Sequence, residues 1–86
     1  MRVTFIKQAL KDMEKIRLNK ALAANVANLI EILETNPFKN PPPYEKLSGE
    51  LSDKYSRRIN RKHRMVYMIN DDEVKILSMW SHYENL

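Results

Sequence analysis

The side-chain chemistry of this sequence leaves few reaction types open. The chain has no cysteine and a single glycine, Gly49, which excludes thiol nucleophiles, cysteine-ligated metal centres and glycine-rich phosphate loops. The two histidines, His63 and His82, fall in separate predicted strands, which excludes a metal motif on one helix. Carboxylate, imidazole, guanidinium and phenol groups remain. These groups are sufficient to cleave RNA through its own 2′-hydroxyl, because that reaction needs a base, an acid and a cation but no metal or other cofactor.

Positive charge is concentrated in one short segment. Residues 54–64 contain no carboxylate, and their basic side chains are Lys54, Arg57, Arg58, Arg61, Lys62 and Arg64. The other nine Lys and Arg residues are outnumbered by 11 Asp and Glu, so the formal net charge of +4 comes from this segment. Neutralised phosphates release counterions, and arginine contacts phosphate through two donors at once. We predict a polyanion-binding surface with phosphates as the usual partner. The alternative partners are an acidic membrane and an acidic protein. The segment could also be a solvated pair of strands that binds no polyanion.

The size of the chain predicts one domain, residues 1–86, with a single small core. The N-terminal stretch has no apolar run near the roughly 20 residues of a membrane span and no signal-peptide pattern. Because cysteine is also absent, we expect a soluble cytoplasmic protein with no membrane partner.

Apolar periodicity predicts a short strand followed by two helices. Residues 2–6 alternate between polar and apolar side chains, with Val3 and Phe5 on one face. The apolar positions of the first helix are Ala9, Leu10, Met13 and Ile16. A second helix should begin after the N-cap residue Asn19 and end before Pro37. Its apolar stripe consists of Leu22, Val26, Leu29, Ile30 and Leu33.

The second half of the chain predicts an ordered loop and then an antiparallel meander. The loop, residues 38–50, contains three consecutive prolines, and such anchored loops often hold functional residues. Strands are predicted at 54–59, 63–69 and 74–83, separated by polar turns. In the last strand, alternation assigns one face to Val74, Ile76, Ser78, Trp80 and His82, and the other to Lys75, Leu77, Met79, Ser81 and Tyr83. The predicted fold is α+β: a small, mostly antiparallel sheet of about four strands, with the two N-terminal helices packed on one face.

Several motifs resemble the YoeB/Txe branch of the RelE/ParE toxin superfamily. They are Ser56-Arg-Arg-Ile59, His63-Arg-Met-Val-Tyr67, the pair His82-Tyr83 and the corner Asn36-Pro-Phe38. The predicted order of elements also matches over the whole chain. The resemblance implies a RelE-like fold and a bacterial toxin that cleaves messenger RNA in the ribosomal A site. It further implies silencing by a cognate antitoxin of the YefM/Axe kind, and homodimers are common in the family.

The resemblance also implies roles for individual residues. The general base falls on Glu45, the phosphate-stabilising cation on Arg64 and the general acid on His82, with Tyr83 beside it to orient the reacting groups. Arg58 matches a second active-site arginine. Lys46 is assigned to phosphate contact, although the position of the family's lysine holds Ser48 here. The remaining bases of the segment are assigned to RNA binding, namely Arg57, Lys54, Arg61 and Lys62. No metal or cofactor is expected.

Two other function classes fit parts of the pattern. Related ParE-type toxins share the fold and act on DNA gyrase, and a basic RNA-binding module would have the same charge distribution. Single residues also have plainer explanations: Glu45 as a loop carboxylate paired with a lysine, and His82 as a half-buried strand histidine. The set of Glu45, Arg64 and His82 favours the nuclease, because a protein that only binds RNA has no need to combine a base, a cation and an acid.

Overall fold

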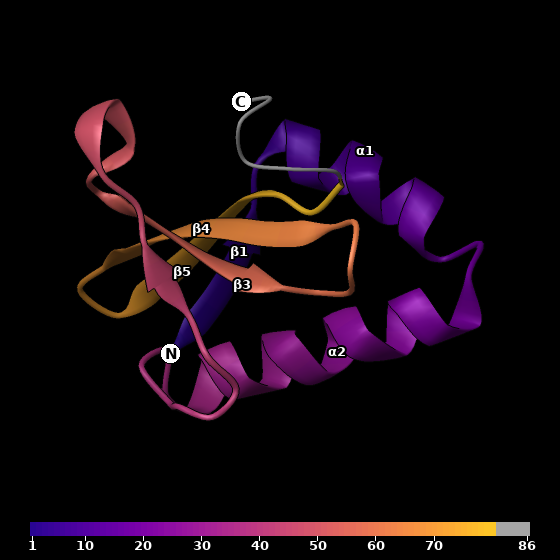
Figure 1. Ribbon diagram of the computed structural model, residues 1–86, viewed down its shortest axis with the longest axis horizontal. Helices are drawn as coiled ribbons and strands as arrows, with labels where there is room; N and C mark the ends of the chain where they lie inside the picture. The colour runs from indigo at the N-terminus through magenta and orange to yellow at the C-terminus, as the bar shows by residue number, and fades with distance from the viewer. Residues whose placement is uncertain (81–86) are drawn as a thin grey trace.

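The computed structural model describes residues 1–80, which form two helices and one sheet (Figure 1). The elements follow the order β1 (Arg2–Phe5), α1 (Lys7–Ile16), α2 (Lys20–Thr35), β2 (Glu45–Lys46), β3 (Lys54–Arg58), β4 (Arg64–Asn70) and β5 (Glu73–Ser78). A short 3-10 turn, η1 (Gly49–Leu51), lies between β2 and β3. The predicted α+β class is confirmed. The described sheet has five strands rather than about four, because Glu45–Lys46 pairs as a short edge strand.

The sheet has the strand order β1-β5-β4-β3-β2. Neighbouring strands from β5 to β2 are antiparallel, whereas β1 runs parallel to β5, with Val3 opposite Val74. The two helices lead the chain from β1 at one edge of the sheet toward β2 at the other (Figure 1). The proline-rich loop therefore enters the sheet beside the basic β3–β4 hairpin.

The helix boundaries follow local sequence signals. Asn19 accepts a hydrogen bond on Oδ1 from the Leu22 N–H at 3.1 Å, which confirms the predicted N-cap. α2 ends at Thr35, two residues before Pro37, as the proline predicts. Within residues 1–80, neither helix combines the length and the apolar character needed to cross a membrane.

One hydrophobic core lies between the helices and one face of the sheet. The helices contribute Ala9, Ile16, Leu22, Val26, Leu29 and Leu33, and the strands and their flanks contribute Ile59, Met65, Tyr67, Val74, Ile76 and Met79. The predicted stripe of α2 is confirmed, with Ile30 partly buried against the core. The helices thus cover one face and leave the other available for a site.

The predicted buried face of α1 was wrong at one position. Leu10 is 55% exposed, and Asp12 is buried instead with an exposed fraction of 2%. The Asp12 carboxylate accepts hydrogen bonds from the Met79 N–H at 2.9 Å and from Gln8 Nε2 at 3.0 Å. A buried carboxylate is tolerated here because it satisfies a main-chain donor just beyond β5.

The last strand is shorter than predicted, and its alternation is interrupted. β5 ends at Ser78, not at residue 83. Tyr67 pairs with Ile76 whereas Val66 pairs with Ser78, so Leu77 is an additional residue in a bulge. Ile76 and Met79 therefore both belong to the core, although regular alternation placed them on opposite faces.

Candidate active site

A small cleft lies where β2, β3 and β4 adjoin. Its lining residues are Pro43, Tyr44, Glu45, Arg58 and Arg64, and its volume is about 240 Å³. Glu45 comes from β2, Arg58 from the last position of β3 and Arg64 from the first position of β4. The structure therefore brings together three predicted site residues that lie on different strands.

Strand register explains why these side chains meet. Glu45 pairs with Ser56, and Arg58 pairs with Arg64. Ser56 and Arg58 are two residues apart on β3 and therefore project from the same face. Paired residues on neighbouring strands also share a face, so Glu45, Ser56, Arg58 and Arg64 all belong to the face that the helices leave uncovered.

Ser56 holds the Arg64 side chain in place. Arg64 donates from Nε and Nη2 to Ser56 Oγ, at 3.2 and 3.0 Å. Ser56 is fully buried, so its hydroxyl is a rigid acceptor beneath the cleft. Sequence reasoning missed this serine. The available signal was its position two residues before Arg58, which places both side chains on one face.

The chain matches the family model of the YoeB-like toxin of bacterial type II toxin-antitoxin systems over residues 5–83. It belongs to this family. The chain is similar to Toxin YoeB of Mycobacterium bovis, with 40% identity over 65 residues that cover 76% of each chain. It also resembles the YoeB of a YoeB-YefM complex from Staphylococcus aureus, with 34% identity, a TM-score of 0.84 and coverage of 96% of this chain and 98% of that chain. The YoeB dimer from the same organism gives a TM-score of 0.83 at the same identity and coverage. The predicted family and fold are confirmed.

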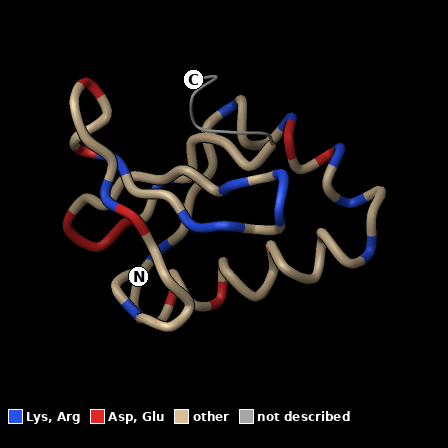
Figure 2. Tube along the Cα trace, viewed as in Figure 1, with Lys and Arg blue, Asp and Glu red and all other residues tan. Residues whose placement is uncertain are grey.

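Basic residues of this YoeB-like toxin are concentrated along the β3–β4 hairpin, as the blue segments of the Cα trace in Figure 2 show. Arg61 and Lys62 are exposed in the turn between the two strands. Lys54 lies at the opposite end of β3 and pairs with the exposed Asp53 at 3.0 Å, and this hydrogen bond lowers the pKa of Asp53 below its ordinary value of 3.8. Arg61 and Lys62 thus extend the positive surface beyond the cleft, whereas Lys54 is separate from it.

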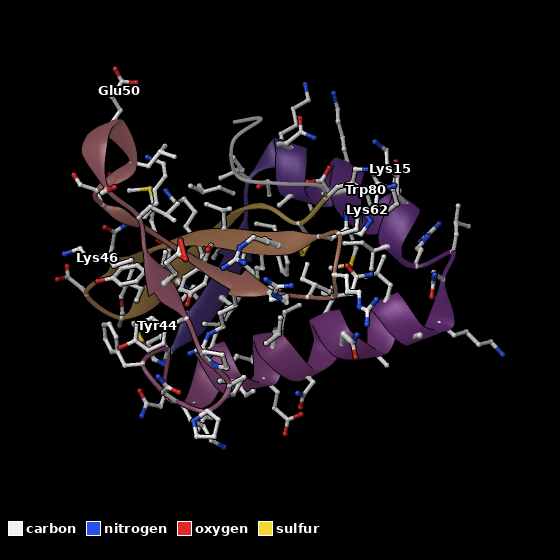
Figure 3. All side chains as sticks on the ribbon, in the orientation of Figure 1. Lys15, Tyr44, Lys46, Glu50, Lys62 and Trp80 are labelled. Carbon is white, nitrogen blue, oxygen red and sulfur yellow. The ribbon has the colours of Figure 1, made fainter. Side chains whose placement is uncertain are left out.

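Lys46 and Glu45 diverge although they are adjacent in the sequence. Lys46 pairs with Tyr55, and Glu45 pairs with Ser56, so the two side chains project from opposite faces of β2. Lys46 is exposed and lies near the outer edge of the molecule (Figure 3). The structure therefore does not bring Lys46 into the cleft with Glu45.

Arg57 is not part of the positive surface. Its side chain has an exposed fraction of 0% and lies on the face opposite Arg58, against the core. Its guanidinium donates to the Tyr67 hydroxyl and to three loop carbonyl groups. The structure therefore does not present Arg57 for the predicted contact with RNA phosphate, because its buried guanidinium already donates to these four partners.

A stack of side chains lies just beyond β5. The His63 ring stacks on Trp80 with a centroid distance of 4.1 Å, and Lys15 Nζ lies 5.4 Å from the centre of the Trp80 ring (Figure 3). Burial lowers the pKa of His63 below 6.5; the positive charge of Lys62 acts in the same direction, and Asp12 opposes it. The predicted general acid His82 and its neighbour Tyr83 lie outside the described residues.

Proposed function

We propose that this toxin is a ribosome-dependent endoribonuclease that cleaves messenger RNA in the ribosomal A site and needs no metal ion. The observation that supports this function is the meeting of Glu45, Arg58 and Arg64 in one cleft. A carboxylate next to two guanidinium groups combines a proton acceptor with cations suited to a phosphate. Membership of the YoeB-like toxins supports the same function.

The proposed reaction is a general acid-base attack by the RNA on itself. Glu45 takes the proton from a ribose 2′-hydroxyl, and the 2′ oxygen forms a bond to the adjacent phosphorus. Arg64, with Arg58, stabilises the negative charge of the phosphorane. His82 donates a proton to the 5′ oxygen as its bond to phosphorus breaks, while Tyr83 orients the groups. The products are a 2′,3′-cyclic phosphate and a 5′-hydroxyl.

The small size of the cleft supports a requirement for the ribosome. The cleft has a volume of about 240 Å³ and is lined by Pro43, Tyr44, Glu45, Arg58 and Arg64, so it contacts only a short part of an RNA strand. The toxin alone therefore makes few contacts that would hold a flexible message in the in-line geometry. A ribosome that already orders the codon supplies this positioning, which is a large part of the barrier reduction in such reactions.

The decisive experiment maps messenger cleavage on translating ribosomes, with and without EDTA. We expect wild-type cleavage to persist in EDTA and to fall by roughly 10²- to 10⁴-fold in Glu45→Gln, Arg64→Ala and His82→Ala. Matched controls are Glu50→Gln and Arg17→Ala, because both residues are exposed and neither lines the cleft (Figure 3 labels Glu50 on η1).

Two outcomes would contradict the proposal. Undiminished cleavage by the Arg64 or His82 variant would exclude the assigned roles. If the wild-type protein cleaved no message and inhibited DNA gyrase instead, the ParE-like function would replace the nuclease.

We also propose an antitoxin partner of the YefM/Axe kind and a homodimer, because the similar Staphylococcus aureus YoeB occurs in a YoeB-YefM complex and as a dimer. An acidic and apolar antitoxin segment would match the exposed Arg58 and Arg61 on the hairpin, and electrostatic attraction would accelerate its capture. Exposed Leu10 and Leu18, at 55% and 86%, offer apolar contacts on the helices.

Purification from the native host tests the partner, and light scattering of the isolated chain tests the dimer. Recovery of a small co-transcribed acidic protein is expected. Recovery of nucleic acid without such a protein would contradict the antitoxin, and a monomeric mass at all concentrations would contradict the dimer.

A further inference from the structure

Arg57 is a buried cation whose hydrogen bonds join two parts of the fold. It is the last residue but one of β3, pairs with Met65 and is fully buried. Nε donates to the Tyr67 hydroxyl at 3.1 Å, which links it to β4. Nη1 donates to the Pro42 carbonyl at 2.6 Å, and Nη2 donates to the carbonyls of Pro37 and Lys39 at 3.0 and 2.9 Å. One guanidinium therefore binds the loop at three positions.

The proline-rich loop needs such a partner. Pro41, Pro42 and Pro43 have no backbone N–H, so this stretch cannot pair with β3 as a regular strand. Its carbonyl oxygens near the core must still accept hydrogen bonds, and the fork of an arginine supplies several donors in a fixed plane. Arg57 supplies such donors to Pro42 within this stretch and to Pro37 and Lys39 before it.

The held loop leads directly to Glu45. Pro42 is three residues before Glu45 in the chain, and the ring of Tyr44 lies 5.1 Å from Arg57 Cζ. Phe38 and Tyr55 make edge contacts with Tyr44 at centroid distances of 6.1 Å each, which packs the loop further. The position of Glu45 at the start of β2 therefore depends on a segment that Arg57 holds.

Burial of this charge is difficult to explain by core stability alone. The contacts of Arg57 in residues 1–80 are to carbonyls, a phenol and an aromatic ring, and none of the ion pairs there includes it. A well-packed apolar side chain of similar volume often serves stability as well as a buried cation does. The directional donors of Arg57 are what an apolar side chain could not supply.

We propose that Arg57 is a positioning residue that places Glu45 in the cleft by holding the loop from Pro37 to Tyr44. The catalytic consequence rests on the proposed nuclease function, whereas the structural consequence can be measured without it. Arg57 acts on the loop from the buried face of β3, and its neighbour Arg58 faces the cleft. The two adjacent arginines thus have separate tasks.

The test compares Arg57→Met with Arg58→Met, a matched change at the next residue. For Arg57→Met we expect the maximal cleavage rate on ribosomes to fall roughly 10- to 100-fold, the scale of a small misplacement of a catalytic group. The half-saturating toxin concentration should change less than about twofold, because a buried side chain contributes no phosphate contact. For Arg58→Met we expect this concentration to rise, its salt dependence to weaken and the maximal rate to fall as well, because Arg58 faces the reacting phosphate in the cleft.

Hydrogen exchange gives a readout that does not require cleavage. Arg57→Met should accelerate exchange of the amides at 38–40 and 44–47, which flank the three prolines, at least about tenfold while the amides of β4 and β5 remain protected. Arg58→Met should leave exchange in the loop unchanged. Arg57→Lys keeps the positive charge but loses the several donors of the planar guanidinium. Its loop exchange and maximal cleavage rate should therefore lie between those of the wild type and Arg57→Met. When Arg57→Met is added to Glu45→Gln, the maximal cleavage rate should fall by no more than about threefold further, because both changes act through the same carboxylate.

Three results would overturn the proposal. These are unchanged loop exchange in Arg57→Met, an effect confined to the half-saturating concentration, or a full additional loss in the Glu45→Gln background. If Arg57→Met unfolds, the test uses Arg57→Lys and Tyr67→Phe, of which the second removes only the acceptor of Arg57 Nε. Unchanged loop exchange in both of these variants would then overturn the proposal. If the wild-type protein does not cleave messenger RNA, the nuclease function fails while loop exchange still decides whether Arg57 holds the loop.

Discussion

Arg64 on β4 donates two hydrogen bonds to the hydroxyl of Ser56 on β3, at 3.2 and 3.0 Å. Ser56 is in turn the register partner of Glu45 on β2. One buried hydroxyl thus orients the proposed phosphate-stabilising cation on the same face as the proposed base. A residue that does not line the cleft therefore positions one of the arginines that do.

Replacement of this hydroxyl should slow cleavage without removing the fold. Ser56→Ala removes the acceptor of the two hydrogen bonds that Arg64 donates to this serine, and hydrogen bonds to charged groups contribute about 1.5–3 kcal/mol. If roughly half of that holds Arg64 in place, the single-turnover cleavage rate on ribosomes should fall about 4- to 13-fold. Ser52→Ala, at an exposed serine, is the control. An unchanged rate in Ser56→Ala would show that Arg64 needs no such support.

Removal of charge in the β3–β4 turn should weaken binding rather than chemistry. Arg61 and Lys62 are exposed and do not line the cleft, so Arg61→Ala and Lys62→Ala should leave the maximal cleavage rate unchanged. Each should reduce the slope of log affinity against log salt by about 0.7, the value for one single-stranded phosphate contact. Ribosome-binding titrations in a potassium chloride series measure this slope. Lys20→Ala on α2 should leave the slope unaltered, and an equal effect there would indicate nonspecific attraction.

Asp12→Ala should destabilise the fold. The buried carboxylate accepts the Met79 N–H at 2.9 Å, and its loss leaves that donor unsatisfied. We expect the free energy of unfolding in urea to decrease by about 1–3 kcal/mol. Glu14→Ala, an exposed carboxylate on the same helix, should change it by no more than about 0.5 kcal/mol. Equal stabilities of the two variants would mean that the hydrogen bond to Met79 contributes nothing.

The stability of the toxin should decrease in mild acid because of His63. Burial lowers the pKa of this imidazole below 6.5 in the folded state, so the unfolded chain binds the proton more readily. The free energy of unfolding should therefore fall as pH decreases below about 6.5 and level off once pH is below the folded pKa. His63→Phe retains a ring against Trp80 but cannot titrate, so its stability should depend less on pH over this window. Thermal unfolding between pH 5 and 8 checks this, and parallel profiles for the two proteins would contradict it.

The sequence by itself determined the features that depend on neighbouring residues. The N-cap at Asn19 and the stop before Pro37 are local preferences of the backbone, and α2 begins and ends where they predict. The α2 stripe and the strand-turn-strand pattern follow from periodicity over a few residues. The charge of residues 54–64 is likewise a property of the chain alone. The family resemblance likewise assigned roles to Glu45 and Arg64, and the structure brings both residues to one cleft.

The tertiary structure alone decided which side of β3 faces the core, where the alternation of β5 is interrupted, and which residue of α1 is buried beside Ala9 and Ile16. Alternation requires Arg57 and Arg58 to point in opposite directions, but the loop carbonyls beneath β3 determine that Arg57 is the buried one. The bulge at Leu77 reverses the alternation of side chains along β5. On α1, Asp12 is buried and Leu10 is exposed, because the Asp12 carboxylate accepts a hydrogen bond from the Met79 N–H. Each of these outcomes depends on hydrogen-bond partners distant in the sequence, which no local pattern specifies.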